Sequence, residues 1–294
     1  MTTPVTMVPL DGSEKDGRAL AVAAALADIA GDDLHLVRVV EHPTTTKSAR
    51  AEALGVTDAA TQLRERARSD TANVAHRFAA DTQRRVTWDL LEAVDVAGAL
   101  TQHAVERDAR FVVMGTRAAN TASRTLRGSV ADRVMRESPR PVVLVPPGAD
   151  FMRGKRVRIG RVLIPLDESV LAARSVDYLL ALPHADELEY VLLTVVAPDA
   201  ARWKEEAEHR LAAAANRVRA RGARAVETVV VEASQPAEAI TATIRDALVE
   251  LIAMSTRGAG GLRRFVLGSV AEGVVRESEV PVMLLTPEAL DAVQ

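Results

Sequence analysis

The stretch GSVADRVMRESPRPVVLVPP (128–147) aligns without gaps on GSVAEGVVRESEVPVMLLTP (268–287), with twelve of twenty positions identical. Each copy reads as a helix start followed by an apolar strand. The segments VTMVPLDGS (5–13) and RVLIPLDES (161–169) form a second matched pair, in which Pro-Leu-Asp ends an apolar run. Self-similarity over such lengths predicts two copies of one folding unit.

The repeat divides the 294 residues into two domains, 1–150 and 157–294. The stretch GADFMRGKR (148–156) carries glycine and charge without apolar periodicity, so it is interpreted as the linker. The second copy is shorter between its two motifs. We assign most of that difference to the polar stretch 42–61.

Within each half, apolar runs alternate with helical patterns. Ser13 is expected to open a helix that Gly31 ends, Asp95 and Ser129 are expected as helix caps, and Ser234 with Pro236 as a further helix start. The expected strands are 5–10, 34–40, 86–91, 110–114, 141–145, 162–166, 189–196, 225–231, 251–254 and 280–285. Continuous apolar strands that alternate with helices predict an α/β fold, with a doubly wound parallel sheet in each half.

Composition excludes several classes of function. Lys+Arg 37 against Asp+Glu 40 leaves a net charge of −3, without the basic excess typical of proteins that bind nucleic acid or anionic membranes. The absence of cysteine removes disulfides and thiolate metal sites, and it suits a reducing cytosol. The start of the sequence lacks the pattern of a signal peptide, and its longest apolar run is too short to span a bilayer. We therefore expect a cytoplasmic protein without nucleic-acid or membrane partners.

Asp11 and Asp167 end the first strand of each half, at the edge where open parallel sheets bind ligands. A carboxylate there can accept hydrogen bonds from a sugar hydroxyl or a base amino group. The alternative is that each aspartate caps the helix that follows. Both interpretations stay open at this point.

A glycine-containing loop follows the fourth strand of each half. It runs from Gly115 to Gly128-Ser129 in the first half and from Ser255 to Gly268-Ser269 in the second. Glycines allow close approach of the backbone to a phosphate, and a helix start adds free N–H groups and the positive end of the dipole. The alternative is a plain connector in which each serine only caps its helix.

The remaining polar residues carry weaker signals. Arg117 and Arg257 lie inside these loops, where a phosphate contact and a solvated side chain are equally compatible with the sequence. The six histidines show no metal-ligand spacing, so a surface or structural role and no metal site are expected. The charged stretch 203–224 is interpreted as an amphipathic surface helix. Neither a GxxxxGK[ST] loop nor a nucleophile elbow occurs, so no catalytic residue is assigned.

With these motifs the chain resembles a tandem universal stress protein over nearly all of both halves. The family's nucleotide signature is Gly, two residues, Gly, nine residues, then Gly-Ser or Gly-Thr. Each half keeps this spacing and lacks one glycine, since Ala118 replaces the second in the first half and Ser255 the first in the second half. The resemblance implies a Rossmann-like strand order of 3-2-1-4-5 in each half, a cytoplasmic role in the stress response, homodimers, and binding of ATP, with Mg²⁺ held through the phosphates.

The resemblance also implies a nucleotide site in each half. The adenine is expected at backbone groups of Val40 and Val196, which lie the same number of residues after Asp11 and Asp167. Pro9 and Pro165 offer only a carbonyl, because proline has no N–H. The second loop keeps more glycine and is the preferred triphosphate site. The nucleotide-binding residues expected from both halves are Pro9, Asp11, Val40, Gly115, Arg117, Gly128, Ser129, Val130, Pro165, Asp167, Val196, Ser255, Arg257, Gly258, Gly260, Gly261, Gly268, Ser269 and Val270.

Three functions remain open from the sequence. The first is an adenine-nucleotide-binding regulatory protein of the stress-response type. The second is a slow ATP hydrolase on the same fold, although no residue is evidently placed as a base for water. The third is a nucleotide-free module for dimerisation or partner binding, which the two missing glycines keep in play.

Overall fold

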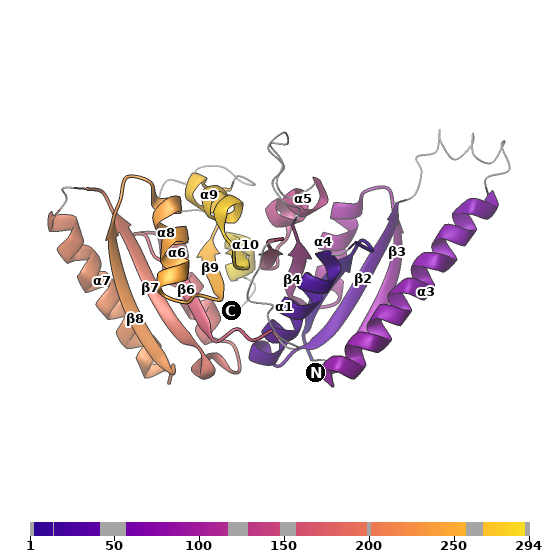
Figure 1. The fold of residues 1–294 in the computed structure, drawn as a ribbon, viewed down its shortest axis with the longest axis horizontal. Helices are drawn as coiled ribbons and strands as arrows, with labels where there is room; N and C mark the ends of the chain where they lie inside the picture. Colours follow the sequence, from indigo (N-terminus) through magenta and orange to yellow (C-terminus); the bar gives the residue numbers. More distant parts are fainter. Residues whose placement is uncertain are drawn as a thin grey trace.

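The computed structural model describes residues 3–13, 15–41, 57–116, 129–147, 157–198, 201–256 and 267–291. Figure 1 shows two halves side by side, with α3 and α7 at opposite outer ends. The expected linker 148–156 lies outside the described residues. No helix in the described ranges is long and apolar enough to cross a membrane.

The first half alternates strand and helix as its sequence predicts. Gly31 ends the first helix with φ +66°, a backbone conformation that glycine adopts without strain. Asp95 caps α4 and accepts a hydrogen bond from the Gly98 N–H. The elements are β1 (Val5–Leu10), α1 (Lys15–Ala30), β2 (Asp33–Glu41), α3 (Thr57–Thr82), β3 (Val86–Ala93), α4 (Val96–Glu106), β4 (Ala109–Gly115), α5 (Ser129–Glu137) and β5 (Val142–Val145).

The second half repeats this order, with short additions. The elements are β6 (Arg161–Pro165), α6 (Val170–Leu180), the 3₁₀ helix η2 (Ala185–Glu187), β7 (Glu189–Val196), α7 (Ala201–Ala220), β8 (Ala225–Glu232), α8 (Pro236–Asp246), β9 (Leu251–Ser255), α9 (Ser269–Glu277), β10 (Val282–Leu285) and α10 (Pro287–Asp291).

Three expected helix caps need correction. Gln235 rather than Ser234 is the N-cap of α8, and Pro236 fills the first turn, where its missing N–H costs nothing. Ser269 is the first residue of α9 and Gly268 its cap, so Ser269 does not cap the helix. α5 likewise begins at Ser129. Ser138 and Ser278 bond the backbone just before β5 and β10, and β10 begins later than expected, at Val282.

The strands of both halves form one sheet, in the order β3-β2-β1-β4-β5-β10-β9-β6-β7-β8. Each half has the expected order 3-2-1-4-5 and parallel pairing throughout. The halves meet where β5 pairs antiparallel with β10, with Val143 opposite Met283. The predicted α/β class and strand order are confirmed, and the joining of the two sheets is an addition from the structure.

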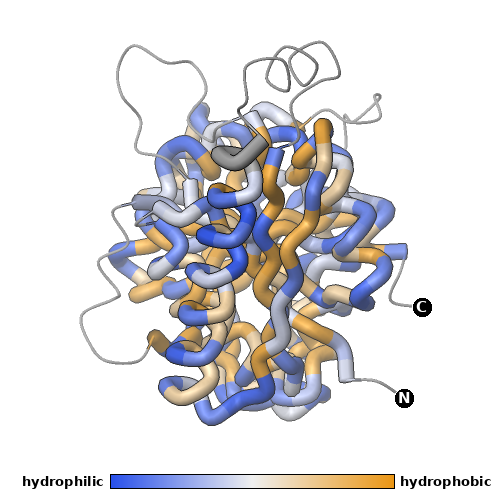
Figure 2. Tube along the Cα trace, turned by 90° about the vertical axis from the view of Figure 1, so that its right-hand side faces the viewer, coloured by the Kyte–Doolittle hydropathy of each residue, from blue (hydrophilic) through white to orange (hydrophobic). Residues whose placement is uncertain are grey.

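The sheet is buried on both faces, as near-continuous apolar strands require. One face packs against α1, α3, α6 and α7, and the other against α4, α5, α8 and α9. In Figure 2 the hydrophobic segments run through the middle of the molecule. Every residue of β5 and β10 is buried, so the seam between the halves belongs to the core.

Further contacts hold the halves together beside the seam. The Tyr178 hydroxyl donates to the Arg110 carbonyl at 3.3 Å, and its ring meets Phe111 edge-on with centroids 6.2 Å apart. The His184 N–H donates to the Ile29 carbonyl at 3.0 Å. Burial raises the pKa of Tyr178 well above its usual range, so its hydroxyl stays protonated as a donor.

Candidate functional site

A cavity of about 600 Å³ opens at the carboxyl ends of the strands in the first half. It lies among β1, β2, β4, α3, α4 and the start of α5, at the edge where ligands bind in open parallel sheets. The structure brings together there all six expected first-half residues that it describes. They are Pro9, Asp11, Val40, Gly115, Ser129 and Val130.

Several charged wall residues were missed by the sequence analysis. Lys15 follows Asp11 by four residues, Arg38 lies on β2, and Arg66 and Asp70 come from α3. Lys15 is the one with a sequence signal, since it begins the helix directly after the Pro-Leu-Asp motif. Arg66 and Asp70 belong to a helix with no motif, and only the fold brings them to the strand ends.

Asp11 is held in place by its own loop. Its Oδ1 accepts the Ser13 N–H at 3.0 Å, and its Oδ2 forms an ion pair with the Lys15 ammonium. Burial would raise the pKa of this carboxyl, but the hydrogen bonds from Lys15 and Ser13 outweigh burial and lower the pKa to about 2. Asp11 is therefore an ionised acceptor at neutral pH.

The loop that follows β1 does not offer its first N–H groups to a ligand. Asp16 accepts from the N–H of Asp11 at 3.2 Å and from the N–H of Gly12 at 2.8 Å. These two donors are therefore occupied within the loop. Any anion in the cavity needs donors from another element.

Asp167, at the matching position of the second half, also accepts the N–H of the serine two residues later. Its Oδ1 accepts from both the N–H and the hydroxyl of Ser169. Ser169 in turn caps α6 by accepting the Ala172 N–H at 3.1 Å. Asp167 thus orients the cap and does not itself cap the helix.

The end of β2 projects past β1 into the cavity. β1 ends at Leu10, opposite Arg38, whereas β2 continues beside β3 as far as Glu41, which pairs with Ala93. Residues 39–41 therefore have a strand on one side only. The wall at this point is formed by Val39, Val40 and Glu41.

The second half fixes which residue of this overhang faces the ligand side. The Leu193 carbonyl accepts the Leu166 N–H at 2.7 Å, so it points toward β6, while the Val196 carbonyl accepts the Ala233 N–H at 3.0 Å, on the β8 side. Successive residues of a parallel strand alternate between their two neighbours. Val195 therefore directs its backbone to the β6 side, past the end of β6. This moves the expected adenine contact from Val196 to Val195, and the same register moves it from Val40 to Val39 in the first half.

Close packing requires a glycine at position 115, which the sequence analysis did not predict. A Cβ at this position would lie 2.6 Å from the Lys15 Cβ and 3.0 Å from the Lys15 carbonyl oxygen. The start of α1 thus approaches the end of β4 too closely for any side chain. Ser255 is the matching residue of the second half, where it is buried.

The N–H groups that the sequence analysis expects to bind a phosphate belong to the first turns of α5 and α9. Ser129 and Val130 line the cavity. In the second half the Gly268 N–H already donates to the Thr256 carbonyl at 2.8 Å, so the free N–H groups belong to the following residues, Ser269 and Val270. Six of the expected residues lie outside the described part of the chain. They are Arg117, Gly128, Arg257, Gly258, Gly260 and Gly261.

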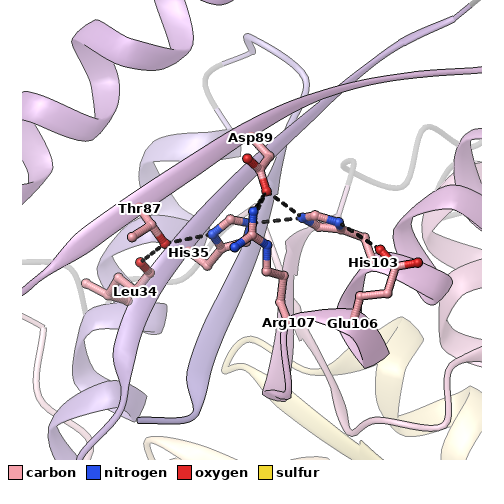
Figure 3. A network of polar contacts seen from close by, with 7 residues as sticks. All are labelled: Leu34, His35, Thr87, Asp89, His103, Glu106 and Arg107. Atoms are coloured by element: carbon pink, nitrogen blue, oxygen red, sulfur yellow. Dashed lines mark hydrogen bonds and ion pairs between the residues drawn. The ribbon is translucent and has the colours of Figure 1, made fainter. Parts of the chain in front are cut away.

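Two of the six histidines meet in space, although their positions in the sequence show no metal-ligand spacing. His35 and His103 are buried, and their Nε2 atoms lie 3.0 Å apart beside Asp89 (Figure 3). Burial lowers the pKa of His35 to about 4 and also lowers the pKa of His103, so both rings are neutral at pH 7. Their separation in sequence hid this cluster, because the residues come from β2, β3 and α4.

Comparison with known proteins finds the same family in each half of the chain. A profile of the universal stress protein family matches residues 5–146 and 158–286. A universal stress protein of Mycolicibacterium smegmatis is 26% identical over 190 residues, which is 62% of this chain and 63% of that protein. The match therefore spans less than two thirds of this relative's length.

Among solved structures, a universal stress protein from Archaeoglobus fulgidus superposes with a TM-score of 0.72 at 21% identity, covering 97% of this chain and 98% of that one. A functionally unknown protein from Pseudomonas aeruginosa PAO1 superposes with a TM-score of 0.64 at 14% identity, covering 99% and 95%. At these identities the likeness concerns the fold, and the profile decides the family. The chain belongs to the universal stress protein family, with one copy of the family's domain in each half.

Proposed function

We propose that this protein binds an adenine nucleotide in the cavity of its first half and acts in the stress response through the nucleotide-bound state. The observation that carries the proposal is the convergence of the six expected residues on one cavity. Its volume of about 600 Å³ lies within the range of about 300–1,000 Å³ typical of small-molecule sites.

The residues that line the cavity suit the base and the ribose of a nucleotide. The apolar side chains of Val39, Met114 and Leu100 suit a flat base, and the overhanging backbone of Val39 offers the paired donor and acceptor that an adenine edge requires. Asp11, ionised beside Lys15, is placed to accept hydrogen bonds from ribose hydroxyls. Pro9 contributes a carbonyl only.

The phosphates belong at the start of α5 in this proposal. Ser129 and Val130 provide N–H groups at the positive end of the helix dipole, where anions are stabilised. Because Asp16 occupies the N–H groups of the β1 loop, α5 is the better anion site. We include Gly128 and Arg117 from the expected loop, and Mg²⁺ held through the phosphates.

We propose an equivalent site in the second half, with Val195 in place of Val196 at the adenine. Its other members are Pro165, Asp167, Ser255, Arg257, Gly258, Gly260, Gly261, Gly268, Ser269 and Val270. The preference for the second half as the triphosphate site stays a prediction. It is tested by Gly128→Val and Gly268→Val, of which the second is expected to weaken ATP binding more.

The test is calorimetric titration with ATP and with AMP, each with and without Mg²⁺. Asp11→Asn and Asp167→Asn form a matched pair, because the two aspartates occupy equivalent strand ends. Loss of a hydrogen bond to a charged group lowers affinity about 10- to 150-fold, which corresponds to about 1.5–3 kcal/mol. We expect Asp11→Asn to weaken the first-half binding by this factor and to leave the second-half binding unchanged.

Absence of binding at millimolar ATP would overturn this proposal and favour the nucleotide-free module. A cytoplasmic location and a homodimer belong to the same proposal. Light scattering after size exclusion, with and without ATP, tests the dimer. Because β5 and β10 already pair with each other, the sheet edges left for a partner in the described chain are β3 and β8.

A further inference from the structure

Two histidines and an aspartate converge beneath α4, away from the nucleotide cavity. His35 lies on β2 between Leu34 and Leu36, which face α1, so its side chain points to the opposite face of the sheet. There it meets His103 of α4 and Asp89 of β3. Figure 3 shows the two imidazole rings on either side of the Asp89 carboxylate.

The three ligand atoms form a triangle of the size that a metal ion requires. The distances are 3.0 Å between the two Nε2 atoms, 3.2 Å from His103 Nε2 to Asp89 Oδ2, and 3.6 Å from His35 Nε2 to the same oxygen. Ligands about 2.0–2.1 Å from a tetrahedral zinc lie about 3.3 Å from one another. The triangle therefore fits three corners of a tetrahedron without rearrangement of the backbone.

The contact of His35 Nδ1 with Thr87 leaves Nε2 as the nitrogen that faces the cluster. His35 Nδ1 lies 2.8 Å from the Thr87 hydroxyl, and the same hydroxyl lies 3.4 Å from the Leu34 carbonyl. Because Thr87 holds Nδ1, Nε2 is the ring nitrogen that faces His103 and Asp89. An outer partner of this kind is what orients metal-binding histidines in proteins. On His103, Nδ1 faces the Glu106 carboxylate at 3.7 Å.

Arg107 closes the cluster on its solvent side. Its guanidinium contacts the same Asp89 oxygen, and its side chain is 45% exposed. A carboxylate oxygen has two lone pairs, so it can bind an ion and keep a hydrogen bond from arginine. The long side chain of Arg107 can also swing into water, which leaves an entry path to the buried histidines.

The second half shows that the fold does not need this cluster. The strand registers place Val191 and Val229 where His35 and Asp89 lie, and the matched helix α8 has Thr243 where α4 has His103. Val191 is fully buried, and Thr243 bonds its own helix backbone. Apolar packing is therefore sufficient at this place, and the buried polar cluster calls for another reason.

We propose that His35, Asp89 and His103 bind a divalent transition-metal ion of the zinc type, with a water molecule in the fourth position. Two imidazoles and one carboxylate suit Zn²⁺ and its neighbours better than Mg²⁺ or Ca²⁺, which prefer oxygen ligands. The site is separate from the nucleotide cavity and does not depend on the proposed function. α4 connects the two, since its first turns line the cavity and its last turn carries His103.

The test is a zinc titration of the untagged, chelator-treated full chain, in competition with a chromogenic chelator. We expect one Zn²⁺ per chain in the unchanged protein. The variant His103→Thr, which installs the second half's residue, is expected to bind at least about 100-fold more weakly, beyond the effect usual for outer partners. Thr87→Val retains all three ligands and is expected to weaken binding about 10- to 100-fold.

His76→Ala is the matched control, because His76 is exposed and lies outside the cluster. It is expected to bind zinc as the unchanged protein does. Cobalt substitution adds a spectroscopic readout, since tetrahedral Co²⁺ gives strong visible absorption that His103→Thr is expected to abolish. If His103→Thr fails to fold by circular dichroism, Thr87→Val and Asp89→Asn take its place.

Arg107→Gln distinguishes a metal site from a purely structural network. If the cluster binds zinc, this variant retains the one-to-one stoichiometry. The proposal is overturned if the unchanged protein binds no more zinc than His103→Thr, if His76→Ala loses as much affinity, or if Arg107→Gln abolishes binding while it remains folded.

Discussion

Gly115 and Gly17 predict opposite responses to the same substitution. At Gly115 an added Cβ meets the Lys15 Cβ at 2.6 Å and the Lys15 carbonyl oxygen at 3.0 Å. Carbon atoms in favourable contact lie about 3.5–4.0 Å apart, so Gly115→Ala overlaps backbone and side chain by about 1 Å. At Gly17, in the first turns of α1, an added Cβ meets nothing within 4 Å.

The magnitudes follow from these surroundings. Overpacking of this kind costs about 1–3 kcal/mol, since Lys15 begins α1 and cannot move without shifting the start of the helix. In contrast, replacing a helical glycine by alanine without a clash stabilises by about 0.5–1 kcal/mol. The free energies of unfolding of the two variants should therefore differ by about 1.5–4 kcal/mol.

Urea unfolding of the ligand-free protein, followed by circular dichroism, measures both values. A Gly115→Ala variant as stable as the unchanged protein would refute the packing argument. In that case the glycine serves only a ligand, and the same variant would weaken nucleotide binding without a change in stability. Ser255→Gly adds the mirror control in the second half, where a side chain is already accommodated at the matching position.

Three further predictions concern the joint between the halves, a buried ion pair and turnover. Tyr178→Ala should lower the free energy of unfolding by about 3–5 kcal/mol, because it leaves a cavity. Tyr178→Phe removes only the hydrogen bond to the Arg110 carbonyl and should lower it by about 0.5–1.5 kcal/mol. Calorimetric unfolding measures both values. Asp32→Ala leaves Arg110 and Thr6 without their shared buried carboxylate. It should lower the free energy of unfolding, measured with a chemical denaturant, by about 3–5 kcal/mol. A decrease below about 1 kcal/mol would contradict this prediction. ATP hydrolysis should stay below about 1 s⁻¹ in a phosphate-release assay, because no base for water is evident in the sequence, and a faster rate would place the protein among enzymes.

Local patterns in the sequence were sufficient to predict each half of the fold. Strand and helix limits agree to within a few residues because apolar runs, caps and glycine stops act over short distances. The antiparallel pairing of β5 with β10 was not predictable in this way. The periodicity of a strand says that it is buried on both faces but does not identify the strand beside it.

The candidate site was predicted only where its residues belong to motifs. Asp11 and Ser129 sit at strand and helix ends, so position in the chain implies position in space. Arg66 and Asp70 have no such marker, because their helix contacts the cavity through tertiary packing alone. The offset between Val196 and Val195 arose because residue counting cannot tell which neighbour a backbone carbonyl faces.

The two halves provide the comparison that a single domain would lack. Positions that matter to the fold are filled alike, as with Asp11 and Asp167, each of which accepts the N–H two residues later. Positions that differ in chemistry, such as His35 and Val191, show what the fold leaves free to vary. A buried histidine pair that one half replaces by apolar packing is therefore better explained by a ligand than by stability. By the same reasoning, the packing role of Gly115 belongs to the first half alone, because Ser255 fills the matching place beside a differently built helix start.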